Sequence, residues 1–385
     1  MAQQLRSANK SNLRIGIAHP SVNPETFTKA HIDRLHEVVM VIHNGIMPTQ
    51  LAGGKVIMNT SGKARAIDGL SGILRGRNFQ QEHTRRIADL LKEHRVDVVL
   101  AEYGYTASEI ADACSKAMVP LVAHFFGKDA HGLEYLERYG NYKLLFQRAS
   151  AIVVVSRTME EHLLQLGAPR EKLVYIACGV DVAMFHSADP IKAPPHFLAV
   201  GRFVEKKAPQ LTLLAFAEVL RSRPDARLTM VGNGPLWETC EQLVKAFGLS
   251  EQIKLCGTRS PSEIVELKRR SRAFIQHSVE ANNGDSEGTP VAIQEAMASG
   301  LPVISTRHAG IMDIITHGVE GSLCAPFDIR AMARHMIQLI DEPARAAEMG
   351  IRGRERAIRD FPVEQQVARL QKVLLQAAKG IPIDA

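Results

Sequence analysis

Residues 284–300 read GDSEGTPVAIQEAMASG, and the rest of the chain is organised around them. The stretch predicts a loop followed by a buried helix. Thr289 suits the N-cap, Pro290 the first helical position and Gly300 the position just past the helix end. The residues between them are mostly apolar or small, so we expect the helix to lie in the protein interior.

Two carboxylates, Glu287 and Glu295, interrupt this apolar stretch. A buried carboxylate is costly unless it is paired or hydrogen-bonded, so each one needs a partner or a ligand. The free amide groups at the start of a helix, together with its dipole, form a site for phosphate. The stretch therefore predicts a phosphate at the helix tip with a carboxylate on each side. The alternative is a capped core helix with one paired glutamate.

Short apolar runs alternate with helical patterns along the chain, which indicates parallel sheets with helices on both faces. Strands are expected at residues 13–18, 38–42, 96–100, 120–126, 151–155, 172–177, 197–200, 227–231, 253–256, 273–276 and 302–305. Besides the helix above, helices are expected at residues 25–38, 82–94, 108–118, 133–148, 157–167, 209–221, 236–247, 262–270, 329–340 and 363–379. Residues 43–80 are glycine-rich and irregular and predict no element.

The length of 385 residues suggests two or three domains, and the proline-rich residues 186–196 are the predicted linker. The alternation of strands and helices restarts after this linker. We therefore expect an α/β protein with two successive doubly wound domains. Ligands of such sheets bind beyond the carboxyl ends of the strands, so the cleft between the domains is the expected site.

A basic loop, GRFVEKK at residues 201–207, follows the first predicted strand of the second domain. The guanidinium of Arg202 and the ammonium of Lys207 would form a clamp for a diphosphate there. The alternative is a solvated basic loop. The later GNG at residues 232–234 also follows a strand, but Trp237 stands where the dinucleotide fingerprint needs a glycine. We interpret it as a tight turn, either near a nucleotide or purely structural.

Several classes of site are excluded by the sequence. It contains no D-x-D, no H-E-x-x-H and no P-loop motif, so we expect no metal and no other cofactor. The five cysteines are odd in number and lack C-x-x-C spacing, which favours reduced thiols in a cytoplasmic protein. The net charge of +6 and the absence of an aromatic–basic motif argue against nucleic acid.

Contact with a membrane is a separate question. Residues 55–95 hold nine Lys and Arg against four Asp and Glu, a local excess of five positive charges. Such a segment suits an anionic lipid or phosphate, and a solvated face without a partner is the alternative. No signal-peptide pattern or spanning apolar run occurs in the sequence. We therefore expect a cytoplasmic protein, with peripheral contact at the inner membrane face left open.

Five pieces of sequence together resemble the large retaining glycosyltransferase family four. They are GVDVAMF at 179–185, GRFVEKK at 201–207, GNGP at 232–235, EGTPVAIQE at 287–295 and AMASGLPVISTRHAG at 296–310. A further segment, ETFTKAHI at 25–32, is similar to the subgroup that builds exopolysaccharide and colanic-acid-like chains. The resemblance covers most of the chain.

This resemblance implies the GT-B fold, in which two Rossmann-like, doubly wound domains face each other across a cleft. It divides the chain into an acceptor-side domain at 1–190, a nucleotide-sugar-binding domain at 191–362, and a C-terminal segment at 363–385. The helix in that last segment would cross back onto the N-terminal domain.

The resemblance also implies roles for matching residues. Arg202 and Lys207 would hold the donor diphosphate and help it leave, Glu295 would bind the ribose hydroxyls, and Glu287 would contact the donor sugar near the reacting carbon. Further donor contacts are expected from the chain at Gly201, Gly288, Thr289, Pro290 and Val291, although Pro290 has no N–H to donate.

The first domain departs from the family pattern F-H-G-x-D, whose histidine faces the donor sugar. The stretch here is FFGKD at 125–129, so Phe126 stands where the family has histidine and Asp129 matches the motif's aspartate as a catalytic candidate. His124 and His131 lie nearby, and either or neither would substitute. A core aromatic at Phe126 is the alternative.

The predicted function is therefore a retaining, metal-independent transfer of a hexosyl group from a nucleotide diphosphate-sugar to a hydroxyl of a saccharide or glycolipid. Acceptor choice would lie largely in residues 43–80. The substitution at Phe126 motivates an alternative, a catalytically silent nucleotide-sugar-binding partner in a polysaccharide assembly complex. A third reading, a sugar-nucleotide epimerase, is disfavoured because the EGTPVAIQE pattern is typical of transferases.

Overall fold

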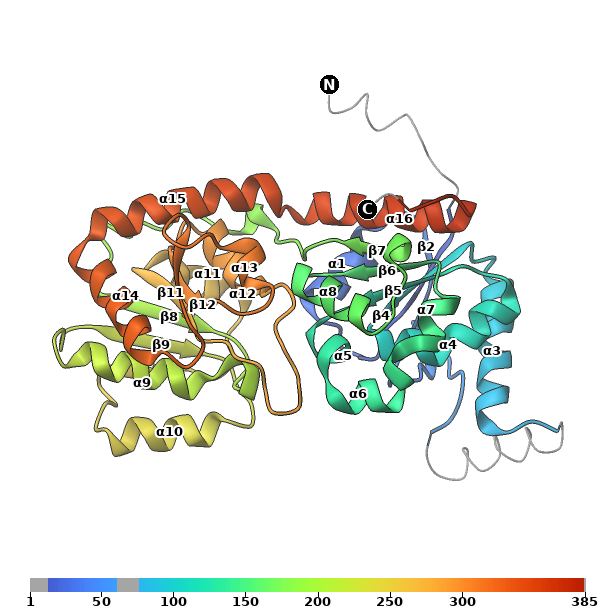
Figure 1. The fold of residues 1–385 in the computed structure, drawn as a ribbon, viewed down its shortest axis with the longest axis horizontal. Coiled ribbons are helices and arrows are strands. Elements are labelled where there is room, and N and C mark those ends of the chain that lie inside the picture. The colour runs from blue at the N-terminus through green and yellow to red at the C-terminus, as the bar shows by residue number, and fades with distance from the viewer. Residues whose placement is uncertain (1–12, 61–75, 384–385) are drawn as a thin grey trace, which may run out of the picture.

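The computed structural model describes residues 13–60 and 76–383. Figure 1 shows two lobes side by side, each with a central sheet and helices around it, joined along one side by the last two long helices. The expected α/β architecture of two doubly wound domains is confirmed.

The N-terminal lobe contains the first sheet, in the order β3-β2-β1-β4-β5-β6-β7 among the described residues. All neighbours pair in parallel except β2 and β3. Its strands are β1 (Ile15–Ala18), β2 (Val38–His43), β3 (Gln50–Leu51), β4 (Val98–Glu102), β5 (Leu121–Phe125), β6 (Ala151–Val154) and β7 (Leu173–Tyr175). Its helices are α1 (Thr26–Arg34), α3 (Phe79–Glu93), α4 (Gly104–Ala117), α5 (Gly127–His131), α6 (Leu133–Arg138), α7 (Lys143–Arg148) and α8 (Arg157–Gln165).

The C-terminal lobe contains the second sheet, in the order β10-β9-β8-β11-β12-β13, with every pairing parallel. Its strands are β8 (His196–Val200), β9 (Arg227–Val231), β10 (Ile253–Leu255), β11 (Ala273–Gln276), β12 (Val303–Thr306) and β13 (Gly321–Cys324). The helices of this half of the chain are α9 (Pro209–Leu220), α10 (Trp237–Ala246), α11 (Pro261–Arg269), α12 (Val291–Ala298), α13 (Ile311–Ile314), α14 (Ile329–Asp341), α15 (Pro343–Asp360) and α16 (Val363–Lys379).

The central strands are mostly apolar and buried along their whole length because helices cover both faces of each sheet. Strands β1, β4, β5, β6, β11 and β12 are buried at every residue. In the second sheet the strand order reverses at β8, which pairs with β9 on one side and β11 on the other. Ligands of open parallel sheets bind at such a reversal, so the loop after β8 is the natural place for a site.

The last helix leaves the second lobe and covers the first. Val367 and Leu370 of α16 belong to the same buried cluster as Ile15 and Ile17 of β1, and Val180 pairs with Pro362 where the chain crosses. In Figure 1, α15 lies over the C-terminal lobe and α16 over the N-terminal lobe. The crossing expected from the family resemblance is confirmed.

Several elements differ from the sequence prediction. The single helix expected at 133–148 is broken between α6 and α7, where Asn141 and Tyr142 adopt left-handed backbone conformations. Five of the described elements were not predicted: β3, α5, α13, β13 and α15. Helix α15 buries mainly small residues, such as Gly350, whose added Cβ would lie 2.0 Å from the Gly300 carbonyl oxygen. Close packing of this kind leaves little apolar periodicity in the sequence.

Three arginines surround a buried carboxylate near the start of α3. Glu82 lies 2.6 Å from Arg85, 3.1 Å from Arg86 and 3.2 Å from Arg77. The hydrogen bond from Arg85 contributes most to lowering the Glu82 pKa to about 2. Arg86 also donates to the Ile57 carbonyl at 2.8 Å. The cluster therefore ties α3 to the segment before residue 60.

We expect Glu82→Gln to lower the free energy of unfolding at neutral pH by about 1 to 2 kcal/mol. The full pKa shift is discounted because the arginines are 25 to 36% exposed. Since the folded-state pKa is depressed, the contribution is complete above the ordinary pKa of 4.5 and fades as the pH falls towards about 2. Urea denaturation at neutral pH and near about pH 3 measures it. The exposed Glu251→Gln is the control, and a Glu82→Gln protein as stable as wild type at neutral pH would contradict the prediction.

Candidate active site

Two glycines hold the basic loop after β8 in place. An added Cβ at Gly232 would lie 1.8 Å from the Gly201 carbonyl oxygen, and one at Gly234 would lie 2.5 Å from that of Phe203. Both glycines have positive φ, and the Phe203 N–H donates to the Asn233 carbonyl at 2.9 Å. The GNG turn after β9 thus supports the loop that carries Arg202 and Lys207.

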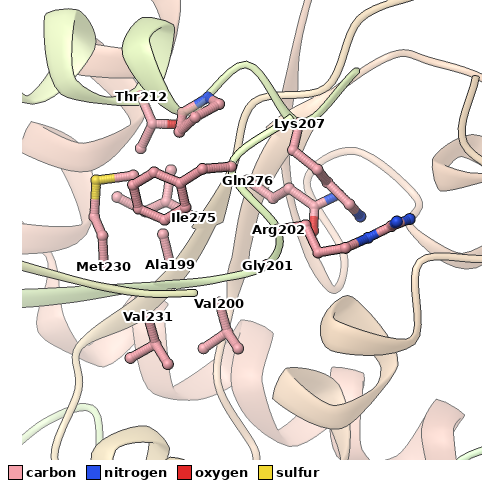
Figure 2. Close-up of a pocket in the computed structure, with 12 residues that line it drawn as sticks. Ala199, Val200, Gly201, Arg202, Lys207, Thr212, Met230, Val231, Ile275 and Gln276 are labelled. Carbon is pink, nitrogen blue, oxygen red and sulfur yellow. The ribbon is translucent and has the colours of Figure 1, made fainter. Parts of the chain in front are cut away.

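Arg202 and Lys207 line one small cavity of about 20 Å³ beyond the end of β8, together with Gly201 and Gln276. Figure 2 shows the two cationic side chains on the same side of the loop, with their nitrogen-bearing ends directed to one region. Arg202 is exposed, and within the described part of the chain its guanidinium makes no hydrogen bond. It is therefore free to meet an anion.

Lys207 forms an ion pair with the first carboxylate of the quoted stretch. Its Nζ lies 2.8 Å from Glu287 Oε1, and the two side chains are 16% and 5% exposed. Ser278 also donates to the same oxygen at 3.2 Å. Burial raises the Glu287 pKa, but Lys207 and Lys206 outweigh that effect and hold it below its ordinary value. Burial lowers the Lys207 pKa, against the attraction of Glu287.

Lys206, which the sequence reasoning did not single out, shapes the loop before α12. Its ammonium donates to Asp285 at 2.8 Å and to the Ser286 carbonyl at 3.1 Å, and the residue is only 7% exposed. His308, after β12, lies 3.0 Å from the Ser286 hydroxyl. The only indication of Lys206 in the sequence is its position beside Lys207 in the GRFVEKK loop.

The start of α12 differs from the prediction. Pro290 occupies the N-cap and Val291 is the first helical residue, so Thr289 is not the cap. The Thr289 hydroxyl instead donates to the Val155 carbonyl at 2.5 Å and accepts from the Cys178 N–H at 3.2 Å, both in the first half of the chain. The prediction failed because this side chain joins the two lobes, which the local sequence does not reveal. Gly300 follows the helix with φ of +71°, as expected.

Gly288 is half-buried and lies in the contact between the lobes. An added Cβ would stand 2.7 Å from Val155 Cγ2, and an added Cβ at Gly310 would stand 1.9 Å from the Gly288 carbonyl oxygen. The loop before α12 is therefore seated against the first lobe, with its backbone close to the Lys207–Glu287 pair.

Glu295 lies further along α12 and faces a different space. It lines a cavity of about 360 Å³ between the lobes, together with Phe27 of α1, Phe185, Ile264 of α11 and Val291. Its carboxylate is paired with Lys268 at 2.5 Å and is 23% exposed. The two carboxylates of the quoted stretch thus have different surroundings: Glu287 is paired with Lys207 of the basic loop, and Glu295 lines the cavity between the lobes.

Asp129 is fully buried at the start of α5. Its carboxylate accepts from the Gly104 N–H at 2.6 Å and the Phe126 N–H at 2.8 Å. Burial raises its pKa to about 7, against the effect of those N–H groups. These contacts join the starts of α4 and α5, as a helix cap would, and the catalytic role stays a prediction.

Phe126 and His124 are also buried, and His131 is half-buried. The Phe126 ring lies 4.3 Å from that of Phe27 and 4.5 Å from that of His124. His131 stacks on His162 at 4.5 Å, and burial lowers its pKa to about 3. Neither His124 nor His131 projects from the protein surface in this arrangement.

One group among the described residues has the spacing of metal ligands. His31, Glu102 and His124 are fully buried with donor atoms within 4.8 Å of one another. His31 Nδ1 lies 2.6 Å from Glu102, and Gln366 Nε2 lies 2.9 Å from His31 Nε2. Two ligands of one zinc ion would lie about 3.3 Å apart, given bonds of about 2.0 to 2.1 Å. The shorter distance fits a hydrogen-bonded group that links α1, the sheet and α16.

Two family models match the chain. The model "Glycosyltransferase Family 4" matches residues 26–184, and the model "Glycosyl transferases group 1" matches residues 185–356. Together they cover both lobes.

Curated relatives agree with these matches. The chain is 30% identical over 290 residues to the putative colanic acid biosynthesis glycosyltransferase WcaL of Escherichia coli, covering 74% of this chain and 71% of the relative. It is 28% identical over 293 residues to the amylovoran biosynthesis glycosyltransferase AmsK of Erwinia amylovora, covering 74% and 72%.

Solved structures share the fold. Anabaena Alr3699/HepE, in complex with UDP and glucose, superposes with a TM-score of 0.71 at 18% identity, covering 94% of this chain and 99% of that one. Sucrose-phosphate synthase from Thermosynechococcus elongatus superposes with a TM-score of 0.71 at 17% identity, covering 95% and 100%.

Proposed function

Because this chain belongs to glycosyltransferase family 4 and has the two-lobed GT-B fold, we propose that it is a retaining, metal-independent hexosyltransferase. The donor is a nucleotide diphosphate-sugar, and the acceptor is a hydroxyl of a saccharide or glycolipid. The relatives of colanic acid and amylovoran biosynthesis support an acceptor that is a growing exopolysaccharide unit.

The observation that carries the proposal is the convergence of charge at the end of β8. Lys207 meets Glu287 at 2.8 Å, and the exposed Arg202 points to the same region. The loop carrying Glu287 leads directly into α12, whose first amides and dipole favour an anion. A diphosphate seated there meets two cations and a helix start, and the donor sugar beyond it comes close to Glu287.

The chemistry follows from these positions. As the bond between sugar and diphosphate breaks, negative charge grows on the leaving phosphate, and Arg202, Lys207 and the α12 amides stabilise it. The acceptor hydroxyl attacks from the face that the phosphate leaves, and the phosphate takes its proton. No strong base is required in this scheme, and the configuration at the reacting carbon is retained.

Two features of the chain bear on where the enzyme works in the cell. Among the described residues, no helix has the length and apolar content to cross a bilayer. We propose a cytoplasmic enzyme with peripheral contact at the inner membrane face, supported by the basic excess in residues 55–95. No cofactor is required besides the donor itself.

We expect transfer to leave the anomeric configuration unchanged and to continue in EDTA, because protein cations replace a metal at the diphosphate. Proton NMR of the early product gives the configuration, with UDP-, GDP- and ADP-sugars as donors and saccharide acceptors. Assays with and without EDTA after dialysis measure the metal dependence. An inverted product contradicts the retaining mechanism, and activity that EDTA abolishes and Mg²⁺ restores contradicts metal independence.

A second candidate function rests on Phe126. Its buried ring stands where the family pattern has a sugar-facing histidine, which favours a partner that binds a nucleotide sugar and transfers nothing. Slow hydrolysis of bound donor separates the two functions. An enzyme releases sugar from at least one donor, whereas binding without hydrolysis or transfer to any acceptor supports the silent partner.

A further inference from the structure

Helix α11 buries one charged side chain in an unusual position. Lys268, in its last turn, is the helix's buried residue, and its side chain has no exposed surface. Its ammonium lies 2.5 Å from Glu295 Oε2 and 4.7 Å from the centre of the Phe185 ring. Among the described residues, Glu295 is its ion-pair partner.

The ion pair between Lys268 and Glu295 compensates the cost of burying the ammonium group. A buried ammonium without a counterion is strongly destabilising, so the contact with Glu295 offsets the loss of hydration. Burial lowers the Lys268 pKa, and Glu295 acts in the opposite direction. The face of the Phe185 ring adds a favourable contact for the cation. Lys268 is therefore held in one place, and it holds one carboxylate oxygen with it.

The other oxygen of Glu295 is left for a ligand. Lys268 donates a hydrogen bond to Oε2, whereas Oε1 makes no hydrogen bond within the described part of the chain. The side chain is 23% exposed and lines the cavity between α1, α11 and α12. A carboxylate oxygen fixed beside a cavity that is lined mostly by apolar residues is a strong acceptor for hydroxyl groups.

We propose that Lys268 is a positioning residue that orients Glu295 toward the ribose of the donor and thereby makes the site select ribose over deoxyribose. This inference rests on the proposed function, because it requires a nucleotide in the cleft. Lys268 lies beneath Glu295, away from the ligand, and acts only through it. Without the ammonium, the carboxylate is free to turn toward solvent, and its preference for a hydroxyl weakens.

Nucleotide affinity tests the proposal directly. Isothermal titration calorimetry of the full chain would compare UDP, GDP and ADP with their 2′-deoxy forms. For the nucleotide that binds, we expect wild type to favour the ribose form by about tenfold, as befits one hydrogen bond to a charged group. Lys268→Met should reduce this ratio to about twofold, and Glu295→Gln should do the same.

The double variant Lys268→Met/Glu295→Gln distinguishes positioning from structural damage. If Lys268 acts through Glu295, adding Lys268→Met to Glu295→Gln should change the ratio no further. The double variant also replaces both charges with neutral groups of similar shape, so it remains folded if the single variant does not. Arg223→Met, which breaks an ion pair with Asp341 at the surface, is the control and should keep the wild-type ratio.

Two results would overturn the inference. One is a wild-type ratio in Lys268→Met, whether both affinities are unchanged or both fall equally, the latter indicating damage to the fold. The other is a further fall in the ratio when Lys268→Met is added to Glu295→Gln. A wild-type protein that binds none of UDP, GDP and ADP would contradict the proposed function itself. That outcome is distinguishable from the ones above, which all require measurable binding to wild type.

Discussion

Replacing Lys207 with alanine is expected to lower kcat for sugar transfer by about 1000-fold. Lys207 supplies the positive charge nearest to Glu287, at 2.8 Å, and lines the same small cavity as Arg202. The leaving diphosphate gains negative charge in the transition state, so losing a preorganised cation affects the chemical step more than binding of the donor. Initial rates with saturating donor measure the effect.

The same substitution also removes the partner of a buried carboxylate. Glu287 is 4% exposed, so Lys207→Ala should lower the free energy of unfolding at neutral pH as well as the rate. The double variant Lys207→Ala/Glu287→Gln removes the unpaired charge and should recover stability while remaining inactive. Lys245→Ala, an exposed lysine of the same lobe, is the control. Near-normal turnover in a folded Lys207→Ala protein would contradict the proposed role of Arg202 and Lys207 in holding the diphosphate.

Replacing Gly127 with alanine is expected to lower kcat by at least about 100-fold while leaving nucleotide affinity within about threefold. Gly127 begins α5 in the first lobe, and an added Cβ would lie 2.0 Å from the Ser286 carbonyl oxygen and 3.1 Å from Lys206 Nζ. Because the nearest atom is backbone, we expect the clash to be relieved by a shift that moves α5 and the Ser286 loop, and with them the two lobes, apart. The proposed diphosphate contacts, Arg202, Lys207 and the α12 amides, belong to the second lobe, so binding should persist when the reacting groups separate.

A matched control exists in the second lobe. Gly353 also lies in a helix, α15, but an added Cβ there meets Met297 at an ordinary 3.7 Å. Gly353→Ala should retain the wild-type kcat, because no contact between the lobes changes. Calorimetric titration with the nucleoside diphosphate, beside transfer assays, separates the two effects. Unchanged kcat in Gly127→Ala would show that close contact of the lobes here is not required for transfer.

Elements with a strong apolar pattern were predicted best. Strands β9 and β11 and helix α16 have the predicted bounds, because short, largely apolar runs and a clear helical stripe mark them in the sequence. Helix α15 was missed because its buried face is built of small residues. The break at Asn141 and Tyr142 was missed because neither residue type demands a left-handed conformation.

The candidate site shows a similar division. The motif residues Arg202, Lys207 and Glu287 were chosen from the sequence, and the structure brings them to one place. Lys206 and Lys268 were not chosen, although both hold carboxylates of the site. A lysine in a sequence gives no sign of its partner, because exposed and buried lysines look alike until the chain is folded.

The sequence by itself determined the alternation of strands and helices, the two lobes and the family, because apolar periodicity and motif spacing are local properties of the chain. Only the tertiary structure decided which charges meet. It placed Lys207 on Glu287, Lys268 on Glu295, and the Thr289 hydroxyl between Val155 and Cys178. These partners come from different segments of the chain, so the local sequence does not reveal them. Burial requires the charged groups to pair, because the free-energy cost of an unpaired buried charge is a large fraction of the net stability of a folded protein.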